Sequence, residues 1–382
     1  MKNNRKIIFL AGFLFSIPLA LTSYINSSFL ESYIGEYYVG IIYVIASIIA
    51  IIGLLEMPKI LTRFGNRSTI LGFTLIGFLS LLMLAFGQNS FVIMLGVILY
   101  FISTDFVIAS MDIFIEDFSK NSGIGKFRGL YLMTINFAWV LAQMISGSII
   151  AKSSFQGIYL FSACFMVLIS IIFILFLRDF KDPKYIKVPI LSTMKTFFRN
   201  KSVSKIYFIN LILKFFFAWM VIYTPIYLYE YLGFDWKQIG LIFTIMLIPF
   251  VLVDFPLGRL SDKIGEKKIL IAGFLVTIFF TLIIPFISIP AVWIWAIVLF
   301  GTRLGAATVE VMSESYFFKE IRERNADEIS FFRNTYPLSF VIAPLIAIPT
   351  LLFVPSFKYL FFVLGAITLI GLFIALRLKD IK

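Results

Sequence analysis

Residues 258–268 read G-R-L-S-D-K-I-G-E-K-K, and this stretch lies between two long apolar runs. A tight connection between two membrane helices needs small residues where backbones approach closely, and Gly258 and Gly265 provide them. The stretch also carries four cations: Arg259, Lys263, Lys267 and Lys268. Because cytoplasmic loops are enriched in Lys and Arg, these cations place the loop on the cytoplasmic side of a membrane. Asp262 is the first carboxylate among them, and we expect it to meet a cation or a helix N-terminus.

The composition supports a membrane environment for the whole chain. Of its 382 residues, 60% are hydrophobic and 14% charged, and the mean hydropathy is +0.99, which excludes an ordinary soluble domain. The net charge of +12 would suit a nucleic acid partner. However, the cations cluster in short loops between apolar runs, so we interpret them as topological and expect a lipid bilayer, not a nucleic acid, as the partner.

Cysteine and histidine are scarce, which limits the possible chemistry. Cys164 is the single cysteine, so no disulfide can form within the chain. Histidine is absent, which excludes histidine metal sites and histidine proton relays. We therefore expect no metal and no cofactor, and any proton coupling must use carboxylates.

Twelve apolar runs are long enough to cross a bilayer, which takes about 20 residues each. They fall near residues 7–30, 39–61, 69–87, 91–115, 129–151, 156–177, 206–229, 238–257, 269–287, 290–314, 331–352 and 357–376. The first run is too long for the core of a signal peptide and shows no obvious cleavage site, so we expect it to remain as an anchor.

The distribution of cations predicts the orientation of these spans. With the N-terminus in the cytoplasm, 28 of the 33 Lys and Arg residues fall in cytoplasmic segments and 3 on the other side. This predicts a multi-pass protein of the cell membrane with both termini in the cytoplasm. Residues 178–205 hold eight cations and form the expected cytoplasmic linker between an N-terminal six-helix bundle (1–177) and a C-terminal one (206–382).

The two halves of the sequence repeat one another. A shift of 200 places residues 57–67 under 257–267 and retains Gly65 and a cation at Arg63, but puts Thr62 where the second copy has Asp262. A shift of 198 aligns the fourth and tenth spans, pairing Asp105 with Arg303 and Asp112 with Glu310. A shift of 201 aligns the fifth span with the eleventh. Similar shifts in the same order indicate a chain built from two related halves.

These features together resemble the Major Facilitator Superfamily. Residues 258–268 are similar to its G-x-L-x-D-r-x-G-r-k loop, and residues 301–306 to its arginine motif. In the fifth span, Gln143 stands where the antiporter-type pattern of the family has proline. The resemblance implies an all-α membrane protein of twelve transmembrane helices in two pseudo-symmetric six-helix bundles. It also implies a cytoplasmic gate loop, which here comprises Gly258, Arg259, Asp262, Gly265, Lys267, Lys268, Gly65 and Arg63.

In this family the first helix of each three-helix unit lines a central cavity. The embedded charges fall on those spans here, except Asp254 and Glu56 near the ends of spans eight and two. Those on the cavity-lining spans are Asp105, Asp112, Lys214, Arg303 and Glu310. Such groups should face one another or water, because an ionised side chain facing lipid costs about 3 kcal/mol or more. We expect Asp105 to approach Arg303 and to carry the coupled proton; the alternative is a permanent structural bridge. Lys214 either binds an anionic substrate with Arg303 or pairs with Glu310.

Other polar and aromatic residues of the first and seventh spans are candidates for lining a substrate cavity. They are Thr22, Tyr24, Asn26, Asn210, Trp219 and Tyr223. These side chains could donate hydrogen bonds to a bound solute or stack on it.

No nucleotide-binding signature and no catalytic cluster is present in the sequence, so we expect neither an enzyme nor an ATP-driven pump. Repeated halves with opposed charges suit a carrier better than a channel. The predicted function is secondary active transport of a small organic solute by alternating access in a monomer. We expect coupling to protons and favour efflux; the alternatives are a proton-linked uptake symporter and a non-transporting receptor on the same fold.

Overall fold

The computed structural model describes residues 2–119, 124–176, 197–253, 256–257, 260–261, 264–320 and 331–379. Every regular element within these residues is helical. The first half contains α1 (Lys2–Ser23), α2 (Asn26–Ile34), α3 (Glu36–Phe86), α4 (Ser90–Ser119) and α5 (Ile124–Phe176). The second contains α7 (Lys201–Ile226), η1 (Tyr227–Tyr231), α8 (Trp236–Leu252), α10 (Glu266–Ile283), η2 (Ile284–Phe286), α11 (Val292–Glu320), α13 (Thr335–Phe353), η3 (Phe357–Tyr359) and α14 (Leu360–Leu376).

The chain divides into two compact units. The first comprises Met1–Lys187 with Asp235–Gly240, and the second comprises Val188–Phe234 with Leu241–Lys382. Most of the expected linker, residues 178–196, lies outside the described residues. At its described end α7 begins at Lys201, where the Asn200 side chain accepts hydrogen bonds from the backbone of Ser202 and Val203.

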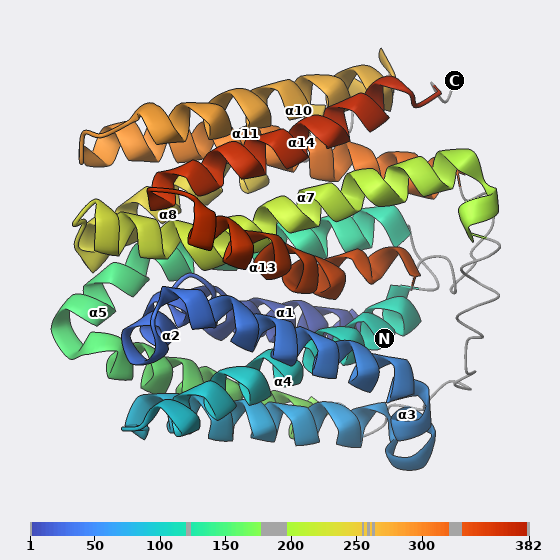
Figure 1. Cartoon of the computed structure of the whole chain (residues 1–382). Helices are drawn as coiled ribbons and strands as arrows, with labels where there is room; N and C mark the ends of the chain where they lie inside the picture. The colour runs from blue at the N-terminus through green and yellow to red at the C-terminus, as the bar shows by residue number, and fades with distance from the viewer. Residues whose placement is uncertain are drawn as a thin grey trace. The chain divides into compact units, whose positions relative to one another are not determined.

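Two helices are twice the length of a membrane span and double back on themselves (Figure 1). At 1.5 Å per residue, the 51 residues of α3 would extend about 77 Å, more than twice the apolar thickness of a bilayer. The α3 helix breaks at Gly65 (φ 75°, ψ 159°), and the α5 helix breaks at Ser153 and Ser154. Both breaks fall in the loops that the apolar runs predicted.

Among the described residues, nine helical segments are long and apolar enough to cross a membrane, and α8 is a shorter apolar helix. Since the α3 and α5 segments each provide two crossings, these elements are consistent with the predicted twelve. Lys6–Ile34, which includes α1 and α2, is counted as a single crossing.

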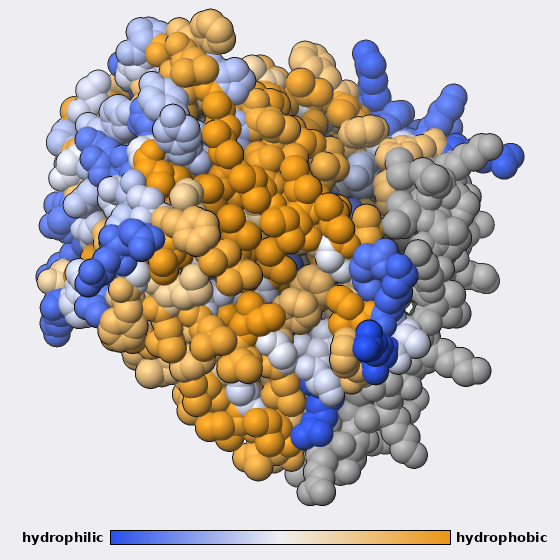
Figure 2. All heavy atoms as spheres, turned by 60° about the horizontal axis from the view of Figure 1, so that its bottom comes forward, coloured by the Kyte–Doolittle hydropathy of each residue, from blue (hydrophilic) through white to orange (hydrophobic). Residues whose placement is uncertain are grey.

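An apolar stripe on α3 shows which of its faces meets lipid. Ile41, Ile45, Ile48, Ile49 and Ile52 recur at helical spacing, and each side chain is at least 40% exposed. In Figure 2, apolar residues spread across the centre of the face in view and hydrophilic residues gather at its left and right. In water such an area would cause aggregation, whereas in a bilayer it is the surface that the hydrocarbon chains cover.

Spans one and seven both depart from regular α geometry, which the sequence did not reveal. Span one is interrupted at Tyr24 and Ile25, between α1 and α2. Span seven passes from α7 into η1, a five-residue π-helix that begins at Tyr227. The shifts of 198–201 map Tyr24 and Ile25 onto residues 222–226, which belong to regular α7, so the π-helix begins just beyond the matching position.

Candidate functional site: the buried charges of the membrane spans

The position of Arg303 follows from the glycines on either side of it. A Cβ on Gly305 would lie 2.5 Å from the Thr277 backbone nitrogen and 2.6 Å from the Gly273 carbonyl oxygen, and a Cβ on Gly301 would meet the Phe280 ring at 2.4 Å. These glycines therefore form the face of α11 that packs closely on α10. A residue two positions away on a helix is turned by about 200°. Arg303 accordingly lies on the opposite side of α11, away from α10.

On that side Arg303 meets aromatic rings of α7. Its guanidinium carbon lies 5.6 Å from the ring centroid of Phe216 and 5.1 Å from that of Phe217, and the residue is 1% exposed. A desolvated guanidinium over an aromatic face gains about 2 kcal/mol from the ring quadrupole. Part of the cost of burying this cation is therefore offset within the second unit.

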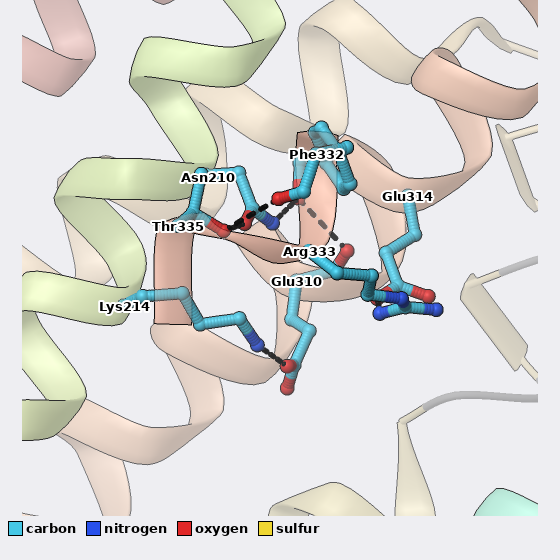
Figure 3. Close-up of polar contacts among 8 residues, drawn as sticks. Asn210, Lys214, Glu310, Glu314, Phe332, Arg333 and Thr335 are labelled. Atoms are coloured by element: carbon cyan, nitrogen blue, oxygen red, sulfur yellow. Dashed lines mark hydrogen bonds and ion pairs between the residues drawn. The ribbon is translucent and has the colours of Figure 1, made fainter. Parts of the chain in front are cut away.

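Lys214 of α7 forms an ion pair with Glu310 of α11 (Figure 3). The two side chains are 14% and 27% exposed. This is the second of the two roles predicted for Lys214. Arg303 and the two rings that it contacts belong to the same two helices. Two kinds of contact therefore connect α7 and α11: the Lys214–Glu310 ion pair and the contact of Arg303 with aromatic rings.

A network of neutral side chains joins α7 to α11 and α13 beside this ion pair (Figure 3). The Thr335 hydroxyl lies 2.7 Å from Asn210 Oδ1, and Asn210 Nδ2 donates to Ser313 Oγ over 3.4 Å. All three residues are buried. The Asn210 amide thus connects α7 to α11 and α13, and its contact with a substrate remains a prediction. Sequence reasoning missed Thr335 and Ser313, because single hydroxyl residues are common in membrane helices.

Glu314 pairs with Arg333 at the exposed end of this group, where Arg333 Nη1 lies 2.7 Å from Glu314 Oε1. Figure 3 shows the two side chains directed toward one another. Arg333 was counted among the cytoplasmic cations, and nothing in the sequence indicated this partner.

In the first unit the embedded charges are carboxylates on α4. Asp105 is 8% exposed, and its Oδ2 has no hydrogen-bond partner among the described residues. Asp112, seven residues further along α4 and also expected to be embedded, is exposed. Because Asp105 and Arg303 belong to different units, their pairing remains a prediction.

The three predicted cavity residues of span one are buried and engaged. Thr22 Oγ1 lies 3.3 Å from the Tyr100 hydroxyl, and the Tyr159 hydroxyl donates to Asn26 Oδ1 over 3.0 Å. The Tyr24 ring packs edge-on against Trp139 with centroids 6.3 Å apart. These contacts are neutral, unlike those around Lys214.

Trp219 and Tyr223 belong to a column of rings on span seven. Its members recur every fourth residue: Phe215, Trp219, Tyr223, Tyr227 and Tyr231. Successive rings from Phe215 to Tyr223 lie 5.3 and 5.4 Å apart, and Tyr227 and Tyr231 lie 6.0 Å apart. Trp219 and Tyr223 are both almost fully buried, and their proposed contact with substrate remains a prediction.

The predicted gate loop is described in part. Gly258, Arg259 and Asp262 lie outside the described residues. Gly65 and Gly265 both adopt positive φ, 75° and 84°. Of the remaining loop cations, Lys267 is half-buried, whereas Lys268 and Arg63 are exposed.

Sequence reasoning overlooked the residue that follows Gly265. Glu266 is 2% exposed; its Oε1 accepts a hydrogen bond from Ser315 Oγ over 3.1 Å and pairs with Lys319, both on α11. A carboxylate in the first turn of α10 also meets the positive end of the helix dipole. No group of three or more metal-ligating side chains occurs in the part of the chain that the structure describes.

A family model described as Major Facilitator Superfamily matches residues 8–309 and 220–381 of the chain. The chain belongs to the Major Facilitator Superfamily. It is therefore a multi-pass membrane transporter, and the predicted two-bundle fold is confirmed by solved structures of the superfamily. The nucleoside transporter NupG superposes with a TM-score of 0.76, covering 99% of this chain and 100% of NupG at 11% identity. A solved point mutant of NupG gives the same TM-score at 13% identity, covering 98% and 99%.

Among curated proteins, the multidrug efflux pump SdrM of Staphylococcus aureus (strain N315) is 26% identical over 127 residues. This match covers 33% of the present chain and 28% of the pump. It is a similarity of one segment, and the NupG structures establish the fold alone.

Proposed function

We propose that this transporter exports a small organic solute in exchange for protons, by alternating access in the cell membrane, with both termini in the cytoplasm. The observation that carries the proposal is Asp105, a carboxyl buried on α4 whose Oδ2 has no hydrogen-bond partner among the described residues. Burying an unpaired charge in an apolar setting is costly, and a bound proton removes that charge. Asp105 is therefore the proposed coupling group.

The direction of transport is supported by the partial similarity to the efflux pump SdrM. Multidrug efflux, the function in that pump's name, supports export of an organic compound. We propose an amphiphilic or aromatic organic compound as the solute, and keep as candidate contacts the predicted residues of spans one and seven: Thr22, Tyr24, Asn26, Asn210, Trp219 and Tyr223.

The test uses the purified protein in proteoliposomes with an imposed pH gradient, after a thermal-shift screen of a compound panel has identified a ligand. In the wild type, the ligand is expected to move in the direction opposite to the proton flux that the gradient drives. In Asp105→Asn the gradient is expected to lose its effect, because an amide cannot release a proton. Asp112→Asn is the matched control, since the same substitution is then made at an exposed carboxylate of the same helix.

Unchanged proton-driven flux in Asp105→Asn would remove Asp105 from the mechanism. Accumulation of ligand toward the cytoplasmic side under an inward proton gradient would replace export by uptake. Ligand binding with no flux in either direction would favour the receptor.

A further inference from the structure

The interruption of span one is a single tight turn. The Ile25 backbone nitrogen donates to the Thr22 carbonyl over 3.0 Å, three residues back, instead of four as in an α-helix. Regular geometry resumes in α2, where Phe29 donates to the Ile25 carbonyl over 2.8 Å. A helix can bend where its regular pattern of backbone hydrogen bonds is interrupted in this way.

The end of α1 that precedes this turn is held by one side chain of α5. Gln143 is 1% exposed, and its Nε2 donates to the Ala20 carbonyl oxygen over 2.5 Å. The Ser146 hydroxyl donates to the Gln143 main-chain carbonyl over 2.9 Å and lies 3.4 Å from Gln143 Oε1, which is at most a weak contact. Both neighbours are neutral, and Ala20 is fully buried. If this donor were removed, the Ala20 carbonyl oxygen would lose a hydrogen bond in a buried position, where water could not readily replace it.

The start of α2, beyond the turn, is held by a different part of the same helix. Tyr159 donates to Asn26 Oδ1 over 3.0 Å, and Tyr159 lies after the break of α5 at Ser153 and Ser154, whereas Gln143 lies before it. Each arm of α5 therefore binds one side of the irregular turn. A change in the angle between the arms would be transmitted to span one at Tyr24 and Ile25.

We propose that Gln143 is a positioning residue of the transport cycle, whose amide fixes the end of α1 to the first arm of α5, so that span one bends at its tight turn only when this bond opens. Proline, which the family pattern has here, cannot donate such a bond, so the restraint is a property of this chain. The link to transport rests on the proposed function, but the restraint itself does not.

The restraint is tested by amide hydrogen exchange of the whole transporter in nanodiscs. Gln143→Met keeps the length of the side chain and removes the donor. Exchange in residues 19–30 is expected to rise about tenfold, because local opening no longer breaks a buried hydrogen bond. Exchange in α3 should stay unchanged. Met144→Leu, at an adjacent side chain that is 62% exposed, is the matched control and should change neither region.

Gln143→Glu provides an independent readout. A protonated carboxyl can donate to the Ala20 carbonyl and an ionised one cannot, so protection of residues 19–30, corrected for intrinsic exchange, should match the wild type near about pH 5 and fall near about pH 9. Wild-type protection at both pH values, or a loss spread equally over α3, would overturn the proposal. Because no step uses substrate, a failed transport assay would count against the proposed function alone.

If a transported ligand is found, a third measurement becomes available. Gln143→Met should change the maximal rate and leave the apparent affinity within about twofold, since the residue acts on a conformational step. A changed affinity at an unchanged rate would instead place Gln143 in direct contact with the ligand and contradict the positioning role.

Discussion

The two units differ in how they accommodate their buried charged groups. The first uses neutral hydrogen bonds, such as Thr22 with Tyr100 and Asn26 with Tyr159, and leaves Asp105 with an oxygen that no described donor reaches. The second has neutral bonds as well, such as Asn210 with Thr335, but adds an ion pair between Lys214 and Glu310 and places the Arg303 guanidinium over aromatic rings. Its buried charges are thus partly offset within the unit, while the first unit contains the carboxyl that gains most from a bound proton.

The largest effect is expected where the second unit is most tightly packed. Gly305→Ala should destabilise it by about 3 kcal/mol or prevent folding, because the new Cβ meets backbone atoms of α10 that cannot rotate away. Gly77→Ala in the first unit should cost less, since its nearest neighbour is the Ser103 hydroxyl, 2.9 Å away at the end of a side chain.

Gly72→Ala is the control for these two variants, because nothing lies within 4 Å of the position that its Cβ would take. Thermal unfolding and size-exclusion profiles in detergent measure all three. Equal stability of Gly305→Ala and Gly72→Ala would show that the close crossing of α10 and α11 is not a constraint.

The ion pair of the second unit comes next. Lys214→Met should destabilise by about 2–3 kcal/mol, because Glu310 would remain as a partly buried carboxylate without its cation. The double variant Lys214→Met with Glu310→Gln should recover most of this loss. A double-mutant cycle of thermal unfolding checks the coupling, and additive effects would argue against a pair that matters to stability.

A smaller effect is expected at the neutral network beside that pair. Asn210→Leu should cost about 1–2 kcal/mol, since Thr335 and Ser313 lose a buried partner. Thr335→Val should weaken the same network. Unfolding of the two single variants and of their combination is expected to show less than additive losses.

The smallest effect is expected at Arg333→Gln. Its side chain is 46% exposed, and a screened ion pair contributes at most about 1 kcal/mol. Stability in low and high salt measures it. A loss as large as that of Lys214→Met would mean that the exposed end of the cluster is as important as its buried part.

Much of the fold could be predicted from the sequence, because the thickness of the bilayer sets the length of every span and an unpaired charge facing lipid is energetically costly. The breaks of α3 and α5 fell inside the predicted loops, and the pairing of Lys214 with Glu310 was one of two stated alternatives.

The rest depended on contacts between segments far apart in the chain. Asn210 and Thr335 are separated by 125 positions, and Glu266 and Lys319 by more than 50. No local sequence pattern could therefore predict that these residues are in contact. The π-helix at Tyr227 left no signal either, because aromatic residues at every fourth position suit a regular helix equally well.

The paired glycines also have a consequence for how this chain could be rebuilt. Gly65 (φ 75°, ψ 159°) and Gly265 (φ 84°, ψ 153°) hold nearly the same backbone shape, and each is followed by a buried polar residue, Asn66 or Glu266, that starts the next helical stretch. The two joints are thus interchangeable in main-chain form and differ in the side chain that follows. A chimera that exchanges them should keep both bends but would place a carboxylate opposite the Ser110 carbonyl, where an amide donates at present.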